Sequence, residues 1–121
     1  MALGSLNLRV SKSDFEARIA IAEASMARLE DVISRYGDAK TNLDQFIESD
    51  DNNYQAMIER IDANIKAAKK AHAALNETKL ELQETINKME GMTDKVKETI
   101  VSATDAAISS VEAAIKIDAI L

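Results

Sequence analysis

The chain has 121 residues, contains no cysteine and no proline, and carries a formal net charge of −6. This acidic balance argues against a nucleic-acid-binding protein, because binding phosphates requires a basic surface. The absence of cysteine excludes disulfides and thiolate metal sites. Aromatic residues are only 3% of the chain, which argues against an enzyme core built around a deep pocket. Alanine, glutamate, lysine, leucine and isoleucine dominate, a profile typical of long helices and coiled coils.

The first twelve residues, 1–12, are predicted to form a flexible N-terminal arm, in which Leu6, Leu8 and Val10 alternate with polar neighbours. No basic region precedes an apolar run of the kind found in signal peptides. No uninterrupted apolar stretch has the length of about 18 residues that a membrane span needs. We therefore expect a protein that is cytoplasmic, or one that is exported without a cleaved signal peptide.

A first helix is predicted over residues 14–48. Ser13 and Glu16 have the spacing of a capping box, in which each side chain accepts a hydrogen bond from the other residue's backbone. Apolar residues then recur at spacings of four and three, which places them on one helix face. Its members are Phe15, Ile19, Ala22, Met26, Leu29, Ile33, Tyr36, Leu43 and Ile47. Gly37 falls inside this pattern and is predicted to be a kink or a helix end, because glycine is unfavourable within a helix.

The polar residues 50–53 predict a turn, because Asp and Asn side chains favour caps and turns over helix interiors. Asn52 and Gln55 are suited to cap a second helix, predicted over residues 53–90. This helix carries the longest helical stripe in the chain. Its members are Tyr54, Ile58, Ile61, Ile65, Ala68, His72, Leu75, Lys79, Leu82, Ile86 and Met89. The stripe is apolar except at His72 and Lys79.

A third helix is predicted over residues 93–120, after an interruption at Gly91. Continuing the heptad phase of the first two helices gives it an expected inner stripe. That stripe comprises Thr93, Val96, Ile100, Ala103, Ala107, Ser110, Ala114, Ile117 and Leu121. We therefore predict an all-α fold within one domain, residues 13–121, built on a long antiparallel helical hairpin of the coiled-coil type. The third segment either folds back to complete a three-helix bundle or extends the second helix.

Catalytic chemistry is not indicated by the residues present. The chain has one histidine and no P-loop, nucleophile-elbow or dinucleotide-binding motif. A helical di-metal site would need Glu-x-x-His, but position 69, three residues before His72, is a lysine. We predict no catalytic, cofactor-binding or metal-binding residues, and no enzyme activity. The cluster Lys66, Lys69 and Lys70 has the spacing of a solvated helix face. The methionines Met57, Met89 and Met92 suit either a core or an adaptable binding surface.

The middle of the chain carries an aromatic–glycine step, Tyr36-Gly37, followed by Ala39, Leu43 and Phe46. This arrangement resembles the Esx-like small helical-hairpin proteins of type VII secretion, which are named for a Trp-x-Gly turn. Tryptophan is absent here, and Tyr36 directly precedes Gly37. The chain is more similar to the small helical proteins encoded beside LXG toxins, which are of similar size. The resemblance implies a turn at Tyr36 and Gly37. It also implies an aromatic-x-x-x-acid export motif, which Phe46 and Asp50 match.

The same resemblance implies a partner, the helical N-terminal domain of a secreted toxin, which the protein helps to target for export. The second helix supplies the anchor residues expected to contact such a partner, or another small helical protein, through their apolar side chains. These are Ile58, Ile65, Leu75, Leu82 and Ile86. The alternative is a self-associating coiled-coil scaffold with no role in secretion, in which the second chain is a copy of the first.

Overall fold

The computed structural model describes residues 10–46, 48 and 52–120, with the side chains of residues 46 and 114–120 left out. Its elements are α2 (Lys12–Phe46), α3 (Asn52–Lys88), the short 3-10 helix η1 (Met89–Gly91) and α4 (Asp94–Ile120). No strand occurs in this part of the chain, so the predicted all-α fold is confirmed. The helix ends fall within one or two residues of those predicted. None of the described helices is long and apolar enough to span a membrane.

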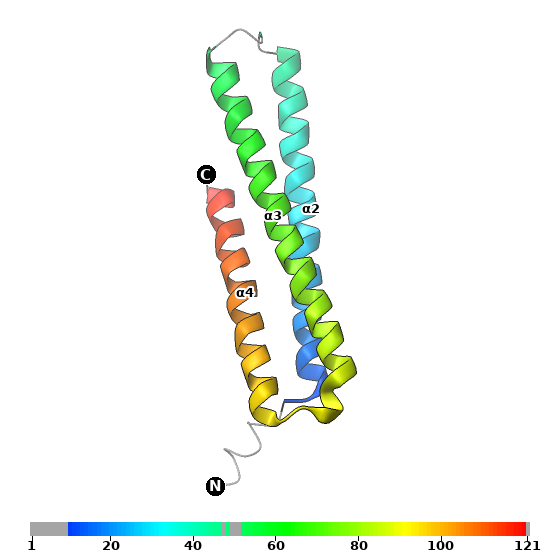
Figure 1. Cartoon of the computed structure of the whole chain (residues 1–121). Coiled ribbons are helices and arrows are strands. Elements are labelled where there is room, and N and C mark those ends of the chain that lie inside the picture. The colour runs from blue at the N-terminus through cyan, green and yellow to red at the C-terminus, as the bar shows by residue number, and fades with distance from the viewer. Residues whose placement is uncertain (1–9, 47, 49–51, 121) are drawn as a thin grey trace.

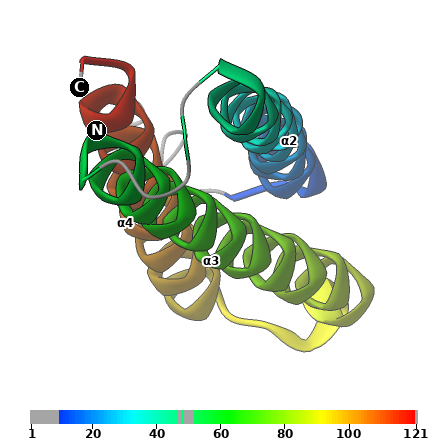
Figure 2. The ribbon, with the colours of Figure 1, turned by 90° about the horizontal axis from the view of Figure 1, so that it is seen from above.

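The three long helices run up, down and up again (Figure 1). α3 returns antiparallel to α2 and packs beside it along its length, whereas α4 approaches each of them closely over a much shorter distance. The view from above shows that the helices are inclined to one another (Figure 2). The third segment therefore folds back onto the hairpin and does not extend α3, which decides between the two predicted arrangements.

The start of α2 lies two residues earlier than predicted. The Ser11 backbone N–H donates to the Asp14 carboxylate at 2.7 Å, and the Ser11 hydroxyl donates to the same oxygen at 3.0 Å. Ser11 and Asp14 have the same serine-to-acid spacing as Ser13 and Glu16, and they begin the helix half a turn sooner. The capping box predicted at Ser13 and Glu16 is therefore wrong in position. Of the predicted arm, residues 1–9 lie outside the described part of the chain.

The helix α2 passes through Gly37 without interruption, so no helix end or turn forms at Tyr36 and Gly37. Gly37 does not have a positive φ, and the Thr41 hydroxyl donates to its carbonyl at 3.1 Å within the helix. Glycine costs about 1 kcal/mol in a helix interior. Packing of α2 against α3 offsets that cost, because tertiary contacts dominate helix stability in proteins.

The start of α4 was placed correctly, but its inner face was not. Thr93 caps the helix, since its hydroxyl accepts a hydrogen bond from the Val96 N–H at 3.3 Å. The face that packs on the hairpin comprises Val101, Thr104, Ile108 and Val111. In the predicted stripe, Val96 is 45% exposed and Thr93, Ala103, Ala107 and Ser110 are exposed as well, whereas Ile100 is half-buried. The side chains of its last members, Ala114, Ile117 and Leu121, lie outside the described part of the chain.

The true face thus lies one residue later than the predicted one, a rotation of about 100° around the helix. The reason lies in the connection between α3 and α4. The 3-10 turn η1 and the non-helical residues Met92 and Thr93 interrupt the α-helical geometry. A heptad count continued across that interruption therefore no longer identifies the residues of α4 that face the hairpin.

The core is a narrow seam where all three helices meet. Its fully or nearly fully buried residues come from each helix: Phe15, Ala22, Ser25, Leu29, Ala68, Leu75, Leu82, Thr85, Thr104 and Ile108. The buried hydroxyls are accommodated locally. Thr85 donates to the Glu81 carbonyl at 2.8 Å, and Ser25 accepts from Arg28 at 3.2 Å. No buried side-chain nitrogen or oxygen in the described part of the chain lacks a hydrogen-bond partner.

Candidate binding surface

The acidic residues and the histidine do not gather into a metal site in the part of the chain that the structure describes. Within the described ranges, no group of three or more His, Cys, Asp and Glu side chains could hold a metal ion. His72, the single histidine, lies with its Nε2 3.5 Å from an oxygen of Glu30 on α2. The basic residues Lys66, Lys69 and Lys70 are exposed, as expected for a solvated face. The feature that remains to be explained is the apolar stripe of α3.

The periodicity of α3 is confirmed by its burial. All eleven residues of the predicted stripe, from Tyr54 to Met89, are buried or half-buried. The stripe faces α2 along the whole hairpin. Its two polar members pair across the seam, since Lys79 lies 3.2 Å from Glu23 and His72 lies 3.5 Å from Glu30.

Burial along this seam is strongly uneven. In the described part of the chain, the buried residues of α2 are Leu29 and residues before it. Those of α3 are Ala68 and residues after it, and the remaining buried residues belong to α4. The rest of the seam is only half-buried. We call this half-buried stretch the open seam; it comprises Tyr36, Leu43, Tyr54, Ile58, Ile61 and Ile65.

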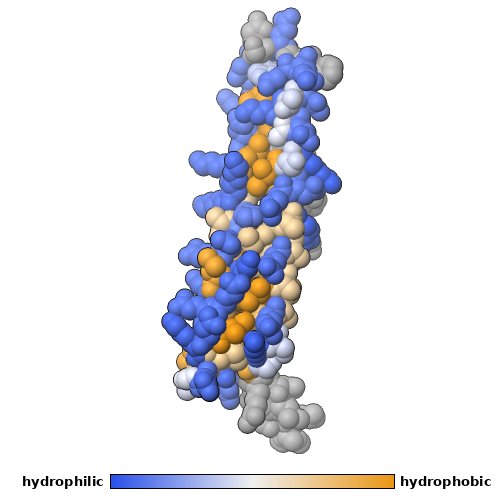
Figure 3. All heavy atoms as spheres, turned by 90° about the vertical axis from the view of Figure 1, so that its right-hand side faces the viewer, coloured by the Kyte–Doolittle hydropathy of each residue, from blue (hydrophilic) through white to orange (hydrophobic). Residues whose placement is uncertain are grey.

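The position of α4 explains the difference. Arg18 on α2 pairs with Asp105 on α4, which sets these residues at one level. Both helices then rise in the same direction (Figure 1). At 1.5 Å per residue, α4 ends about 22 Å further on, near the level of Ile33. The hairpin continues beyond that level for about 20 Å as two helices, and no other described helix covers its seam there. Figure 3 shows the face that looks away from α4, where apolar residues are visible between charged ones both at this level and lower down.

The predicted partner anchors divide according to this geometry. Leu75 and Leu82 are 0% exposed, so they are core residues in this structure and not surface anchors, contrary to the prediction. Ile58 and Ile65 belong to the open seam, and Ile86 is half-buried near the opposite end of α3. Leu75 and Leu82 occupy one heptad position of the stripe, whereas Ile58, Ile65 and Ile86 occupy the other, which is half-buried at every level of α3.

The hairpin around the open seam is held by polar contacts at its edges. Lys40 on α2 pairs with Asp62 on α3 at 2.9 Å. The Tyr54 hydroxyl donates to the Asp44 carboxylate. This hydrogen bond raises the pKa of Tyr54, because it stabilises the protonated phenol beside a negative charge. These contacts join α2 and α3 at a level where the core is thin.

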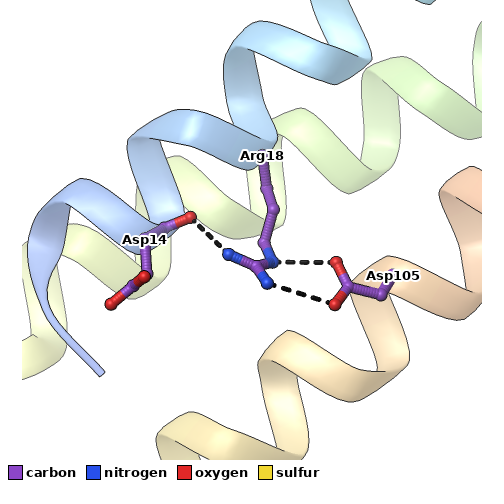
Figure 4. Close-up of polar contacts among 3 residues, drawn as sticks. All are labelled: Asp14, Arg18 and Asp105. Atoms are coloured by element: carbon purple, nitrogen blue, oxygen red, sulfur yellow. Dashed lines mark hydrogen bonds and ion pairs between the residues drawn. The ribbon is translucent and has the colours of Figure 1, made fainter. Parts of the chain in front are cut away.

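An ion pair between Arg18 and Asp105 joins α4 to the hairpin (Figure 4). The Arg18 guanidinium donates to both oxygens of Asp105, at 2.8 and 3.1 Å, and to the Asp14 carbonyl at 2.9 Å. Such a fork is the favoured geometry of an arginine–carboxylate pair. Sequence reasoning missed this pair, since the two residues are separated by 87 positions and no local pattern connects them.

The candidate export motif is not placed by the structure. Phe46 is the last residue of α2, but its side chain and Asp50 lie outside the description. The candidate turn at Tyr36 and Gly37 lies within continuous helix, as described above.

Comparisons with known protein families, curated proteins and solved structures found no match to this chain.

Proposed function

We propose that this protein is a non-catalytic helical binding protein that receives an amphipathic helix of a partner on its open seam. The observation that supports this most directly is the gradient of burial. At one heptad position of α3, Ala68, Leu75 and Leu82 are buried beside α4, whereas Ile61 and Tyr54, at the same position beyond the end of α4, are only half-buried. A helix laid on the open seam would continue the packing that α4 provides lower down, which is the helix-in-groove mode of recognition.

We further propose that the partner is the helical N-terminal domain of an LXG-type toxin, and that binding helps to target the toxin for type VII secretion. This part rests on the resemblance described in the sequence analysis. A genomic neighbour encoding such a toxin would support it.

The test is capture of partners from the native host with the tagged full-length chain. The disruptive variant is Ile61→Asp, which introduces a charge into the open seam. The matched control is Ala63→Asp, which introduces the same charge on the exposed face of the same turn of α3. The helicity of each variant is measured by circular dichroism, because a loss of capture is informative only in a folded protein.

We expect the wild-type chain and Ala63→Asp to capture a protein with an LXG-type helical domain. Placing a charge where an apolar side chain was half-buried should weaken capture by Ile61→Asp at least ten-fold, a loss of about 1.4 kcal/mol. Equal capture by the two variants would show that the partner does not bind at the open seam. Recovery of additional copies of this chain alone, lost in Ile61→Asp, would favour the self-associating scaffold.

A further inference from the structure

The groove occupied by α4 and the open seam are parts of one groove. Ile108 of α4 packs in a cluster with Ala22 and Leu29 of α2 and with Ala68 and Leu75 of α3. Residues of the open seam occupy the same heptad positions. Tyr36 and Leu43 follow Leu29 on α2 at intervals of seven, and Ile61 and Tyr54 precede Ala68 on α3 at the same intervals. A helix that docks on the open seam therefore lies end to end with α4. A longer helix would meet the C-terminal end of α4 and compete with it for the same surface.

The contacts that hold α4 in this groove are few. Among its described side chains only Thr104 and Ile108 are buried, and Val101 and Val111 beside them are half-buried. One of the two buried residues is thus a threonine, which contributes less apolar area than leucine or isoleucine would. The Arg18–Asp105 pair lies at the surface, with side chains 22% and 52% exposed, so solvent weakens it.

The connection to α3 permits α4 to move as a unit. η1 ends at Gly91, which is exposed and has open space around it. Met92 is in an extended conformation, and α4 has its own cap at Thr93. Because α4 is capped independently, it can leave the groove without disturbing the hydrogen bonds of α3.

We propose that α4 is a displaceable helix, which occupies the groove until a partner's helix enters from the open seam, and that the Arg18–Asp105 pair is the latch that holds it. The role of the partner rests on the proposed function. The opening of α4 does not, and it can be measured on the free protein.

The experiment is amide hydrogen exchange of the full-length chain, followed residue by residue under native conditions. Amides of α4 between residues 98 and 113 are expected to exchange through an opening that leaves the central amides of α2 and α3 protected. Arg18→Ala should speed exchange in α4 about two- to five-fold, the effect of losing one partly exposed ion pair. Exchange at the centre of α3, around Leu75, should not change.

Two further variants separate the latch from a general effect of removing an arginine. Arg35→Ala is the matched control, since Arg35 also lies on α2 and pairs with an acidic residue, Asp31, but on the exposed surface away from α4. It should leave exchange in α4 unchanged. Reversing both partners of the latch, Arg18→Asp together with Asp105→Arg, should restore the wild-type rate.

A single exchange rate with one denaturant dependence across all three helices would overturn the proposal, because α4 would then open only by global unfolding. Equal effects of Arg18→Ala and Arg35→Ala would overturn the latch. Either result leaves the proposed function intact, since a helix can dock on the open seam without displacing α4. Conversely, failure to capture a toxin would leave the opening of α4 unaffected.

Discussion

Replacing Gly37 by alanine distinguishes the continuous helix of this structure from the turn that the resemblance to Esx-like proteins implies. Gly37 lies inside α2, does not have a positive φ, and a Cβ added to it would meet no atom within 4 Å. The new methyl group therefore causes no steric clash. Alanine is more favourable than glycine in a helix interior by about 0.5–1 kcal/mol. Gly37→Ala should stabilise the protein by that amount.

The corresponding shift in melting temperature follows from the size of the chain. The entropy of unfolding is about 2.1 cal/mol/K per residue, so a domain of this length gains roughly 4 °C per kcal/mol. We expect Gly37→Ala to raise the melting temperature by about 2–4 °C, measured by circular dichroism, with a matching increase in the free energy of unfolding in urea. Gly91→Ala is the control. It also has open space, but it lies at the end of η1, outside any α-helix, and should change stability less.

A loss of stability in Gly37→Ala would refute this reasoning. Glycine at a turn usually adopts a positive φ, where alanine is strained. Destabilisation would therefore indicate that the chain reverses at Tyr36 and Gly37. In that case α2 would be two helices, and the open seam would not exist in the form described.

Two further predictions concern the core and the first helix cap. Leu75→Ala, at a fully buried position, should lower the free energy of unfolding in urea by about 2–5 kcal/mol. Ile61→Ala, at the same heptad position in the open seam, should cost less than half as much, and equal costs would contradict the gradient of burial. The hydrogen bond from the Ser11 N–H lowers the pKa of Asp14. A folded-state pKa below the unfolded one gives stability that is complete above about pH 4 and is lost as the pH falls through the folded value. An NMR titration should show this lowered pKa, together with fraying of the first turn of α2 at acidic pH; an Asp14 pKa at the ordinary value would contradict the cap.

Much of the fold could be predicted because it depends on local patterns. The stripe on α3 is a property of spacing alone, and its burial followed it at every position. The polar cluster before Asn52 and the Gly91–Thr93 break also act locally, so the helix ends were predicted closely. The position of the first cap was missed because Ser11–Asp14 and Ser13–Glu16 satisfy the same spacing rule, and the sequence offers no means of choosing between them.

The candidate site depended on features that are not local. Whether Leu75 or Ile61, which share a heptad position, is accessible is decided by the level at which α4 ends, and that level depends on how α4 is positioned against α2. The same holds for the inner face of α4. Thr104 and Ile108 are buried because the connection after η1 rotates the helix, and periodicity within residues 94–120 favours neither face strongly, since alanine and β-branched residues occur all around it.

The two polar residues of the α3 stripe help to determine where the open seam lies. In an antiparallel hairpin, a shift of one heptad, about 10 Å, would keep apolar positions opposite apolar positions. It would not keep every polar partner matched. Glu23 and Glu30 on α2 face Lys79 and His72 on α3, seven residues apart on each helix. A shift in one direction would place Glu30 opposite Lys79 and leave Glu23 opposite Ile86. A shift in the other would give Lys79 and His72 new acidic partners, Glu16 and Glu23, but it would separate Lys40 from Asp62.

Each of these pairs contributes little to stability, because their carboxylates are more than half exposed. Their effect is on register. Polar residues within a heptad seam commonly fix the alignment of helices at some cost in stability. Here the alignment determines how far the hairpin extends beyond α4, and therefore which apolar side chains remain for a partner. Lys79 and His72, together with the Lys40–Asp62 pair, thus act on the proposed binding surface from a distance, by favouring the register that leaves the open seam uncovered.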